Sequence, residues 1–406
     1  MTEHENHTPV GIPAPEAGDG PVGDPPVPAV TGAPSDPRRT ATAGGESPSP
    51  RPRRRRWPWA VFLVLVVATA VASRWNLDSY AVQPGTAQSV QPFITVPADK
   101  SHRVSHPVLL TDVQIGRVTA LTYPFYWLQG DTSFVPLGDV TGGTPPSQLD
   151  AQGRLEMSQA EASAKTAALR HLGYQVTATP SGAVIFGTFP GTPAYRTLSV
   201  GDVVTAVDGV STPTARALTT SLASHHSGQT VSLTVRKGGT AAPAPVPVTL
   251  KSTVVDLGGG RTATLDLGIL PEDQVDFGYP INVTINVTNI GGPSAGLAMT
   301  LGVIDALTAG SVTGGRTVAA TGTIDSQGDV GDVGGVPQKT VAVENAGASL
   351  FLVPPQEYQN AMSKDRPGLK IYAVSTLDQA LSVLAAHGGT VPAPAAGASL
   401  HATAAG

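Results

Sequence analysis

An uninterrupted apolar run from Trp57 to Ala72, directly after a cluster of arginines, constrains this chain more than any other feature. At about 1.5 Å per residue, a helix of that length is near the lower limit for crossing the hydrocarbon core of a membrane. The basic cluster at 51–56 predicts, by the positive-inside rule, that the N-terminus is cytoplasmic and that everything after Arg74 is extracytoplasmic. The sequence therefore predicts a transmembrane signal anchor at 57–73 in a single-pass protein of the cell membrane.

Two other interpretations of the apolar run stay open. Ala70-Val71-Ala72 resembles a signal-peptidase site, which would make the run a cleaved signal peptide, although the more than 50 residues before it are too many for one. A buried core helix is the second alternative, and the four consecutive arginines beside the run argue against it.

Composition sets limits on the remaining segments. The Pro-, Gly- and Ser-rich tail at 1–56 and the Ala/Gly-rich end at 387–406 predict disorder. From Arg74 onward, 18 Lys and Arg face 23 Asp and Glu, a net charge of −5, which gives no electrostatic footprint for nucleic acid. The chain has no cysteine and no His-Glu-x-x-His motif, so we expect no disulfide, no metal site and no cofactor.

Residues 80–172 form an N-terminal ectodomain region of short apolar strands followed by one helix. Ser158 and Glu161 form a capping-box pattern that predicts a helix from Ser158 to Leu172, and Gly173 is typical of the residue that ends one. The whole ectodomain therefore indicates an α+β multidomain protein.

Residues 173–250 form a β-rich unit with one specific signature. The run from Leu198 to Gly209 places a Gly-Asp turn before a strand that ends in an Asp-Gly turn, and it resembles PDZ domains. That resemblance implies strand addition of a peptide, with Tyr174, Ile185 and Phe186 as candidates for the groove. The alternative is a spacer that only positions the next domain.

Residues 251–386 alternate strand and helix patterns and contain the candidate site. Ser294 lies in Gly-Gly-Pro-Ser-Ala-Gly, where a loop enters a helix. No histidine occurs between Asp256 and Ala386, and the only lysines there are Lys339, Lys364 and Lys370. A serine nucleophile in this segment therefore predicts a Ser-Lys dyad.

Lys339 is the expected base because Pro337 makes it a first-turn residue of a helix, where the positive helix end favours the neutral amine. Valines around it predict burial, which also lowers a lysine pKa. Free amides at the start of the Ser294 helix suit an oxyanion, with Gly291, Gly292 and Ala295 as candidates.

The stretch from Gly291 to Pro354 resembles the proteolytic domain of Lon-type serine proteases. It contains Gly-Pro-Ser-Ala-Gly, a Thr-Gly strand and Gly-Gly-x-x-x-Lys, which implies Ser294 as nucleophile, Lys339 as base and Thr321 as a supporting hydrogen-bond partner. Lon enzymes usually carry Asp before Gly-Pro-Ser, and this chain has Gly291 there. The order anchor, PDZ, Lon domain is similar to YlbL-type bacterial membrane proteases, and Lon-type domains commonly form rings, so the resemblance admits a homo-oligomer.

No Gly-x4-Gly-Lys-[Ser/Thr] loop occurs in the sequence, so we expect no ATP binding. The sequence therefore predicts an ATP-independent, membrane-anchored serine endopeptidase that cleaves extracytoplasmic proteins or peptides. A catalytically inactive PDZ scaffold and a protein that cuts only itself stay open as alternatives.

Overall fold

The computed structural model describes residues 57–142, 144–256, 261–287, 290–364 and 367–392. The tail predicted at 1–56 lies outside the described residues, as does most of the tail predicted at 387–406. The chain divides into two units after Pro58, and only Trp57 and Pro58 of the first unit are described. The tertiary contacts reported below all lie within the second unit.

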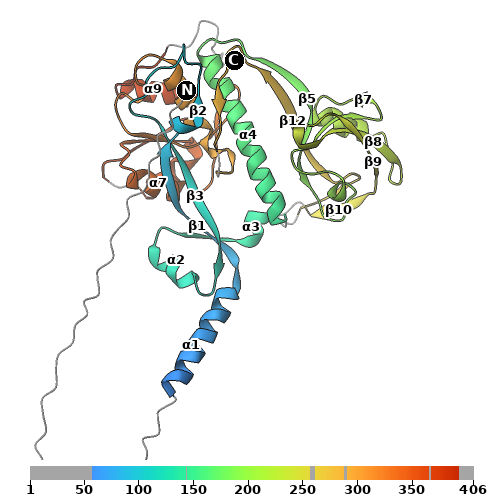
Figure 1. Ribbon diagram of the computed structural model, residues 1–406, viewed down its shortest axis with the longest axis horizontal. Coiled ribbons are helices and arrows are strands. Elements are labelled where there is room, and N and C mark those ends of the chain that lie inside the picture. Colours follow the sequence, from blue (N-terminus) through green and yellow to red (C-terminus); the bar gives the residue numbers. More distant parts are fainter. Residues whose placement is uncertain (1–56, 143, 257–260, 288–289, 365–366, 393–406) are drawn as a thin grey trace, which may run out of the picture. The chain divides into compact units, whose positions relative to one another are not determined.

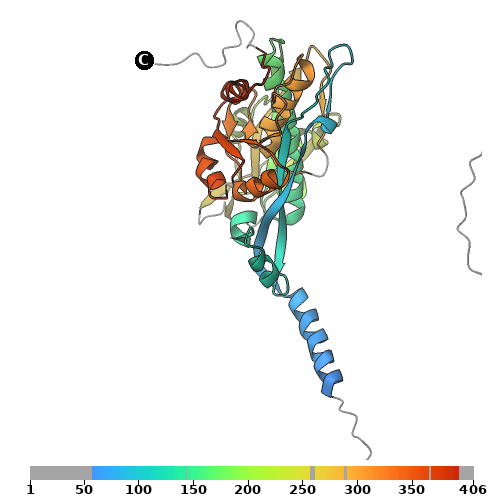
Figure 2. The same ribbon diagram turned by 90° about the vertical axis from the view of Figure 1, so that its left-hand side faces the viewer.

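The apolar run forms a single helix, α1 (Trp57–Arg74), shown in blue in Figure 2. It is long and apolar enough to cross a membrane, and none of its residues is buried against protein. At about 1.5 Å per residue its 18 residues extend about 27 Å, close to the thickness of a hydrocarbon core. The predicted apolar N-terminal helix is therefore confirmed.

A six-stranded mixed sheet forms the centre of the largest domain. Its strands, in spatial order, are β18 (Lys370–Ala373), β17 (Leu350–Val353), β14 (Val318–Ala320), β3 (Leu109–Thr119), β1 (Asn76–Ser89) and β4 (Ser133–Pro136). The first four are parallel, whereas β1 is antiparallel to both β3 and β4. Strands from both sides of the PDZ segment thus share one sheet, and the domain boundaries predicted from sequence stay a prediction.

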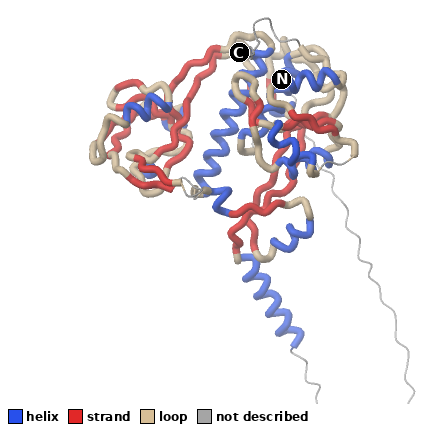
Figure 3. The backbone as a smooth tube through the Cα atoms, turned by 180° about the vertical axis from the view of Figure 1, so that it is seen from behind, coloured by secondary structure: helices blue, strands red, loops and turns tan. Residues whose placement is uncertain are grey.

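Helices cover both faces of this sheet (Figures 1 and 3). In β17, Leu350 and Leu352 belong to one apolar cluster and Phe351 and Val353 to the other, which explains why this strand has no polar position. The first cluster contains residues of α4 (Pro146–His171), α6 (Gly296–Leu307) and α9 (Leu377–Ala386), and the second residues of α7 (Val336–Asn345) and α8 (Tyr358–Met362).

The PDZ segment has its own sheet and its own core. Its strands, in spatial order, are β12 (Ile269–Gly278), β5 (Thr177–Thr188), β6 (Val203–Val207), β8 (Thr230–Arg236) and β9 (Ala244–Thr249), with β7 (Val210–Ser211) paired to β6. The helix α5 (Ala215–Leu222) begins at Thr214, whose hydroxyl accepts a hydrogen bond from the Ala217 N–H.

The remaining elements are short. They are the helices α2 (Tyr123–Gln129) and α3 (Leu137–Thr141), the paired strands β2 (Ile94–Thr95) with β13 (Thr284–Ile285), β10 (Thr253–Asp256) with β11 (Thr262–Leu265) and β15 (Thr323–Ile324) with β16 (Val330–Gly331), and the 3-10 turns η1 (Gln91–Phe93), η2 (Ala194–Arg196), η3 (Lys237–Gly239), η4 (Pro293–Ala295) and η5 (Pro355–Glu357).

The long helix α4 begins 12 residues before the predicted position, at Pro146 rather than at Ser158. Proline at the first helical position has no N–H to leave unpaired, so it starts the helix without a side-chain cap. Ser158 lies in mid-helix, and Glu161 instead accepts the Val287 N–H at 2.7 Å. The predicted end is correct: Gly173 has φ 83° and donates to the Arg170 carbonyl.

Candidate active site

Ser294 lies in the 3-10 turn η4, immediately before α6, as the Gly-Gly-Pro-Ser-Ala-Gly pattern predicts. Gly292 enters the turn with φ 87°, a conformation that glycine adopts readily. Gly296 is required for a different reason, because a Cβ there would lie 2.8 Å from the backbone nitrogen of Ile324. Ser294 is half-buried and Ala295 is buried, so the serine stands at the edge of the core.

The helix α4 holds this turn from the side. The Gly292 N–H donates to the Gly153 carbonyl at 3.1 Å, and the two backbones approach closely because Gly153 and Gly291 have no side chains. This bond occupies one of the amides predicted for the oxyanion. Of the other two candidates, Ala295 lies in the same turn as Ser294, whereas Gly291 precedes the turn and is exposed.

Lys339 is almost completely buried in the first turn of α7, with 2 % of its surface exposed. Gly335, with φ 70°, precedes the helix, and its carbonyl accepts the Lys339 N–H at 2.9 Å. The Lys339 Nζ donates to the Thr321 hydroxyl at 3.2 Å. The two other lysines are different: Lys364 pairs with Asp131 near the surface and Lys370 is exposed.

Thr321 connects the two candidate residues. Thr321 and Gly322 form the short connection between β14 and β15, and Gly322 has φ 146° there. At this connection the Gly322 N–H and the Thr321 hydroxyl both donate to the Ser294 carbonyl, at 3.0 and 3.3 Å. Among the described residues no hydrogen bond joins Ser294 Oγ directly to Lys339 Nζ, so the link between them runs through Thr321.

The environment of Lys339 favours the neutral amine. Burial lowers the pKa of Lys339 from 10.5 to about 8, while the carboxylates of Asp112 and Glu357 act in the opposite direction. Asp112 is held by Thr86, whose N–H and hydroxyl donate to its carboxylate at 2.6 and 2.9 Å. A lysine with a pKa near 8 can accept a proton at neutral pH, which an ordinary lysine cannot.

Sequence reasoning did not find Asp112, Glu357 or the buried Thr111. Asp112 and Thr111 lie on β3, which is remote in sequence and becomes a neighbour of the site only through its pairing with β14. Ala320 pairs with Leu110 in parallel, and each is followed by a buried threonine, Thr321 after β14 and Thr111 on β3. The available signal was Thr111, a polar residue that directly follows the apolar run at 108–110.

A groove of about 690 Å³ lies between α4 and the chain that leads to the nucleophile turn. Its lining includes Gly153, Glu161, Asn286, Val287 and Gly291. The groove therefore runs up to the segment that leads into the turn of Ser294. Within the described ranges, no three His, Cys, Asp or Glu side chains are grouped to hold a metal.

The structure does not bring the three PDZ groove candidates together. Tyr174 packs against the core of the large domain, Ile185 is fully enclosed in the PDZ core, and the Phe186 carbonyl accepts from Gln152 of α4 at 2.9 Å. The strand β12 pairs with β5 along its whole length, and Asp273 of β12 accepts the Ala215 N–H of α5. The edge of β5 is therefore already paired with the chain's own strand.

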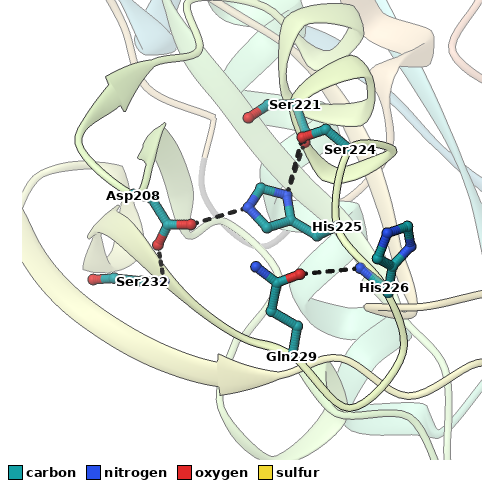
Figure 4. A network of polar contacts seen from close by, with 7 residues as sticks. All are labelled: Asp208, Ser221, Ser224, His225, His226, Gln229 and Ser232. Atoms are coloured by element: carbon teal, nitrogen blue, oxygen red, sulfur yellow. Dashed lines mark hydrogen bonds and ion pairs between the residues drawn. The ribbon is translucent and has the colours of Figure 1, made fainter.

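Figure 4 shows a second polar network, in the PDZ domain. The Asp208 carboxylate contacts the His225 ring at 3.0 Å and accepts the Ser232 N–H at 2.7 Å. Asp208 has φ 49°, as expected for the Asp-Gly turn predicted at this point, and its carboxylate ties that turn to β8. This network stabilises a turn and is separate from the Ser294 region.

Comparison with known proteins agrees with both predicted domains. Residues 276–386 match the family described as Lon protease (S16) C-terminal proteolytic domain, and residues 171–248 match the PDZ domain family. The chain is 33 % identical over 126 residues to a Lon protease of Rickettsia bellii, covering 30 % of this chain and 16 % of the relative. It is 34 % identical over 121 residues to Lon protease 2 of Bacillus subtilis, covering 30 % and 20 %.

The solved PDZ domain of an SdrC-like protein from Listeria monocytogenes is 21 % identical, covering 22 % of this chain and 87 % of that one, with a TM-score of 0.19. The chain spans a fifth or less of the length of the two Lon proteases it matches. It thus contains a Lon-type proteolytic domain, which supports a serine peptidase, together with a PDZ domain.

Proposed function

We propose that this protein is an ATP-independent, membrane-anchored serine endopeptidase with Ser294 as nucleophile and Lys339 as general base. The observation that carries the proposal is the burial of Lys339 with a pKa of about 8, one hydroxyl away from the carbonyl of Ser294. No ion pair with Lys339 occurs among the described residues, so its burial costs stability. Side chains with strongly perturbed pKa values cluster at functional sites.

In the proposed reaction, Ser294 Oγ rotates to within hydrogen-bond reach of Lys339 Nζ when substrate enters the groove. The neutral amine takes the hydroxyl proton as the oxygen attacks the scissile carbonyl, and the resulting ammonium gives it to the leaving amine. The amides of Ser294 and Ala295 in η4 would face the oxyanion, because those of Gly292, Gly296 and Leu297 already donate to backbone carbonyls. Water then hydrolyses the acyl-enzyme, with Lys339 again as base.

Thr321 would act as a positioning residue in this scheme. Its hydroxyl accepts from Lys339 and donates to the Ser294 carbonyl, so it fixes the amine relative to the nucleophile turn without contacting substrate. Once Ser294 Oγ has rotated toward Lys339, the Thr321 hydroxyl can hold the protonated amine between the two proton transfers.

The apolar helix and the absence of a P-loop motif from this sequence define the proposed substrates. With α1 in the membrane and the arginine cluster in the cytoplasm, residues after Arg74 face the extracytoplasmic side. No P-loop sequence is available to bind ATP and unfold proteins, so flexible or already unfolded segments are the expected substrates. The PDZ domain suits protein or peptide partners.

Cleavage assays with two point variants test the proposal. Casein and a flexible peptide should be cleaved by the full-length chain, and both Ser294→Ala and Lys339→Ala should abolish cleavage. Lys364→Ala, which removes a lysine of the same domain that pairs with Asp131, should retain it. Unchanged cleavage in both site variants would refute the proposal.

A catalytically inactive scaffold is the second candidate. The absence of a direct Ser294–Lys339 hydrogen bond among the described residues favours it. A scaffold would show no cleavage that depends on Ser294, under conditions where the PDZ domain is folded.

A further inference from the structure

The helix α2 and its approach form an exposed apolar surface that the proposed peptidase chemistry does not use. We call this surface the aromatic patch and define it as Trp75, Leu121, Tyr123, Phe125, Trp127 and Leu128. Trp127 and Leu128 are 67 % and 75 % exposed. The helix sequence, Tyr-Pro-Phe-Tyr-Trp-Leu-Gln, contains no charged residue. Soluble domains rarely expose this many large apolar side chains within one short segment to water.

Backbone hydrogen bonds fix this patch to the C-terminal end of α1. The Leu121 N–H donates to the Ala72 carbonyl at 3.2 Å, and the Ala120 N–H donates to the Trp75 carbonyl at 2.9 Å. A threonine turn rigidifies the approach, since the Thr119 N–H donates to the Thr122 hydroxyl at 3.0 Å. The patch therefore begins at the level where the apolar helix ends.

We infer that the aromatic patch docks into the outer interfacial layer of the bilayer in which α1 is anchored. Tryptophan and tyrosine are enriched at that depth because their rings are apolar and their N–H and O–H groups reach the headgroups. Continuity with the end of α1 favours lipid over a protein partner, since any partner on the patch would have to displace headgroups. This inference rests on the proposed membrane anchor.

Docking would hold the active site at a set height above the membrane. β3 runs from Thr119, beside the patch, to Asp112, whose carboxylate acts on Lys339. Seven residues of strand at about 3.3 Å each span about 23 Å. With two contacts to the bilayer rather than one flexible tether, the ribbon of β1 and β3 acts as a rigid spacer, and the enzyme would favour segments at that height.

The lack of cysteine makes a site-directed test direct. Leu128→Cys, Val254→Cys and Val64→Cys variants of the full chain would each carry one nitroxide, in liposomes of phosphatidylcholine and phosphatidylglycerol. Val254 is the matched control because it is an apolar residue of similar exposure, 70 %, on β10. Val64 lies in α1 and reports the anchor itself.

We expect relaxation by oxygen to exceed relaxation by a water-soluble nickel reagent at Leu128 and Val64, and the reverse at Val254. If the label at position 64 is lipid-embedded while the label at position 128 is as water-accessible as the one at position 254, the docking is overturned and the anchor stands. A water-accessible Val64 label would instead refute the anchor. Dipolar broadening between Leu128 labels on different copies would also overturn the inference, because the patch would then be a contact between protomers.

A double variant provides a functional readout. The variant carrying both Trp127→Asp and Leu128→Asp should lift the aromatic patch into water. A nitroxide on Phe125→Cys in the same chain would report this as increased relaxation by the nickel reagent. The double variant should reduce cleavage of a lipid-tethered peptide while leaving cleavage of the same peptide free in solution unchanged. Equal cleavage of the lipid-tethered peptide by the wild type and the double variant would overturn the role of the aromatic patch in setting the height of the active site.

Discussion

Replacing Lys339 by methionine should make the protein more stable while it abolishes activity. Burial lowers the pKa of Lys339 from 10.5 to about 8. Holding the charged amine in the fold at neutral pH therefore costs about 3 kcal/mol. Methionine has a similar length and no charge, and the lost hydrogen bond to Thr321 offsets about 1 kcal/mol. The expected net gain at pH 6.5 is about 2 kcal/mol.

The size of this stability gain depends on pH. Because the folded pKa lies below the unfolded value, the unfolded chain binds more protons between pH 8 and 10.5, and wild-type stability rises with pH there. The gain from Lys339→Met should therefore be full below about pH 8 and disappear by about pH 10.5.

The measurement is urea unfolding of the full chain in detergent at pH 6.5 and at pH 10.5, with pulse proteolysis to quantify the chain that remains folded. Lys364→Met is the control, because Lys364 is partly exposed and paired with Asp131, so its loss should give no gain. A Lys339→Met protein that is less stable than wild type at pH 6.5, or equally stabilised at both pH values, would refute the reasoning.

Three further predictions concern activity. The kcat/KM of the wild type should rise about tenfold per pH unit below a pKa of about 8 and then level off. Asp112→Asn should move this rise to lower pH, because it removes a charge that raises the pKa of Lys339, whereas Asp99→Asn at an exposed position should not. An unchanged pH profile in Asp112→Asn would contradict the assignment. Thr321→Val should lower kcat by one to two orders of magnitude, on the order of what a positioning group supplies, and should leave KM little changed. Thr321→Ser should retain most of the wild-type kcat. A change in KM alone would contradict the positioning role. Gly296→Ala should lower the melting temperature and inactivate the protein, because the added methyl would lie 2.8 Å from the backbone nitrogen of Ile324. A stable, active variant would show that the turn can relax.

Local signals in the sequence were enough to locate the helix of Lys339 and the turn of Ser294. Pro337 fixes the start of α7 and Gly347, with φ 71°, its end, so the lysine had to lie in the first turn. Burial of the amine followed from the valines around it. These features depend on residues within a few positions of each other, and that is why they could be predicted.

Features that depend on distant pairing could not be predicted. No local pattern shows that β3 lies beside β14, and the carboxylate of Asp112 reaches Lys339 only through that pairing. The same holds for β12, whose pairing with β5 encloses the edge that the PDZ resemblance led us to expect as open. The early start of α4 was missed because Pro146 begins it without a capping side chain.

The central claim is that Lys339 activates Ser294, and labelling with a serine-reactive fluorophosphonate tests it most directly. Mass spectrometry of the full chain after labelling at pH 8.5 should find the phosphonate on Ser294, and Lys339→Met should remove that adduct although the protein remains folded. An unmodified Ser294 in an enzyme that cleaves casein, or equal labelling in Lys339→Met, would contradict the account.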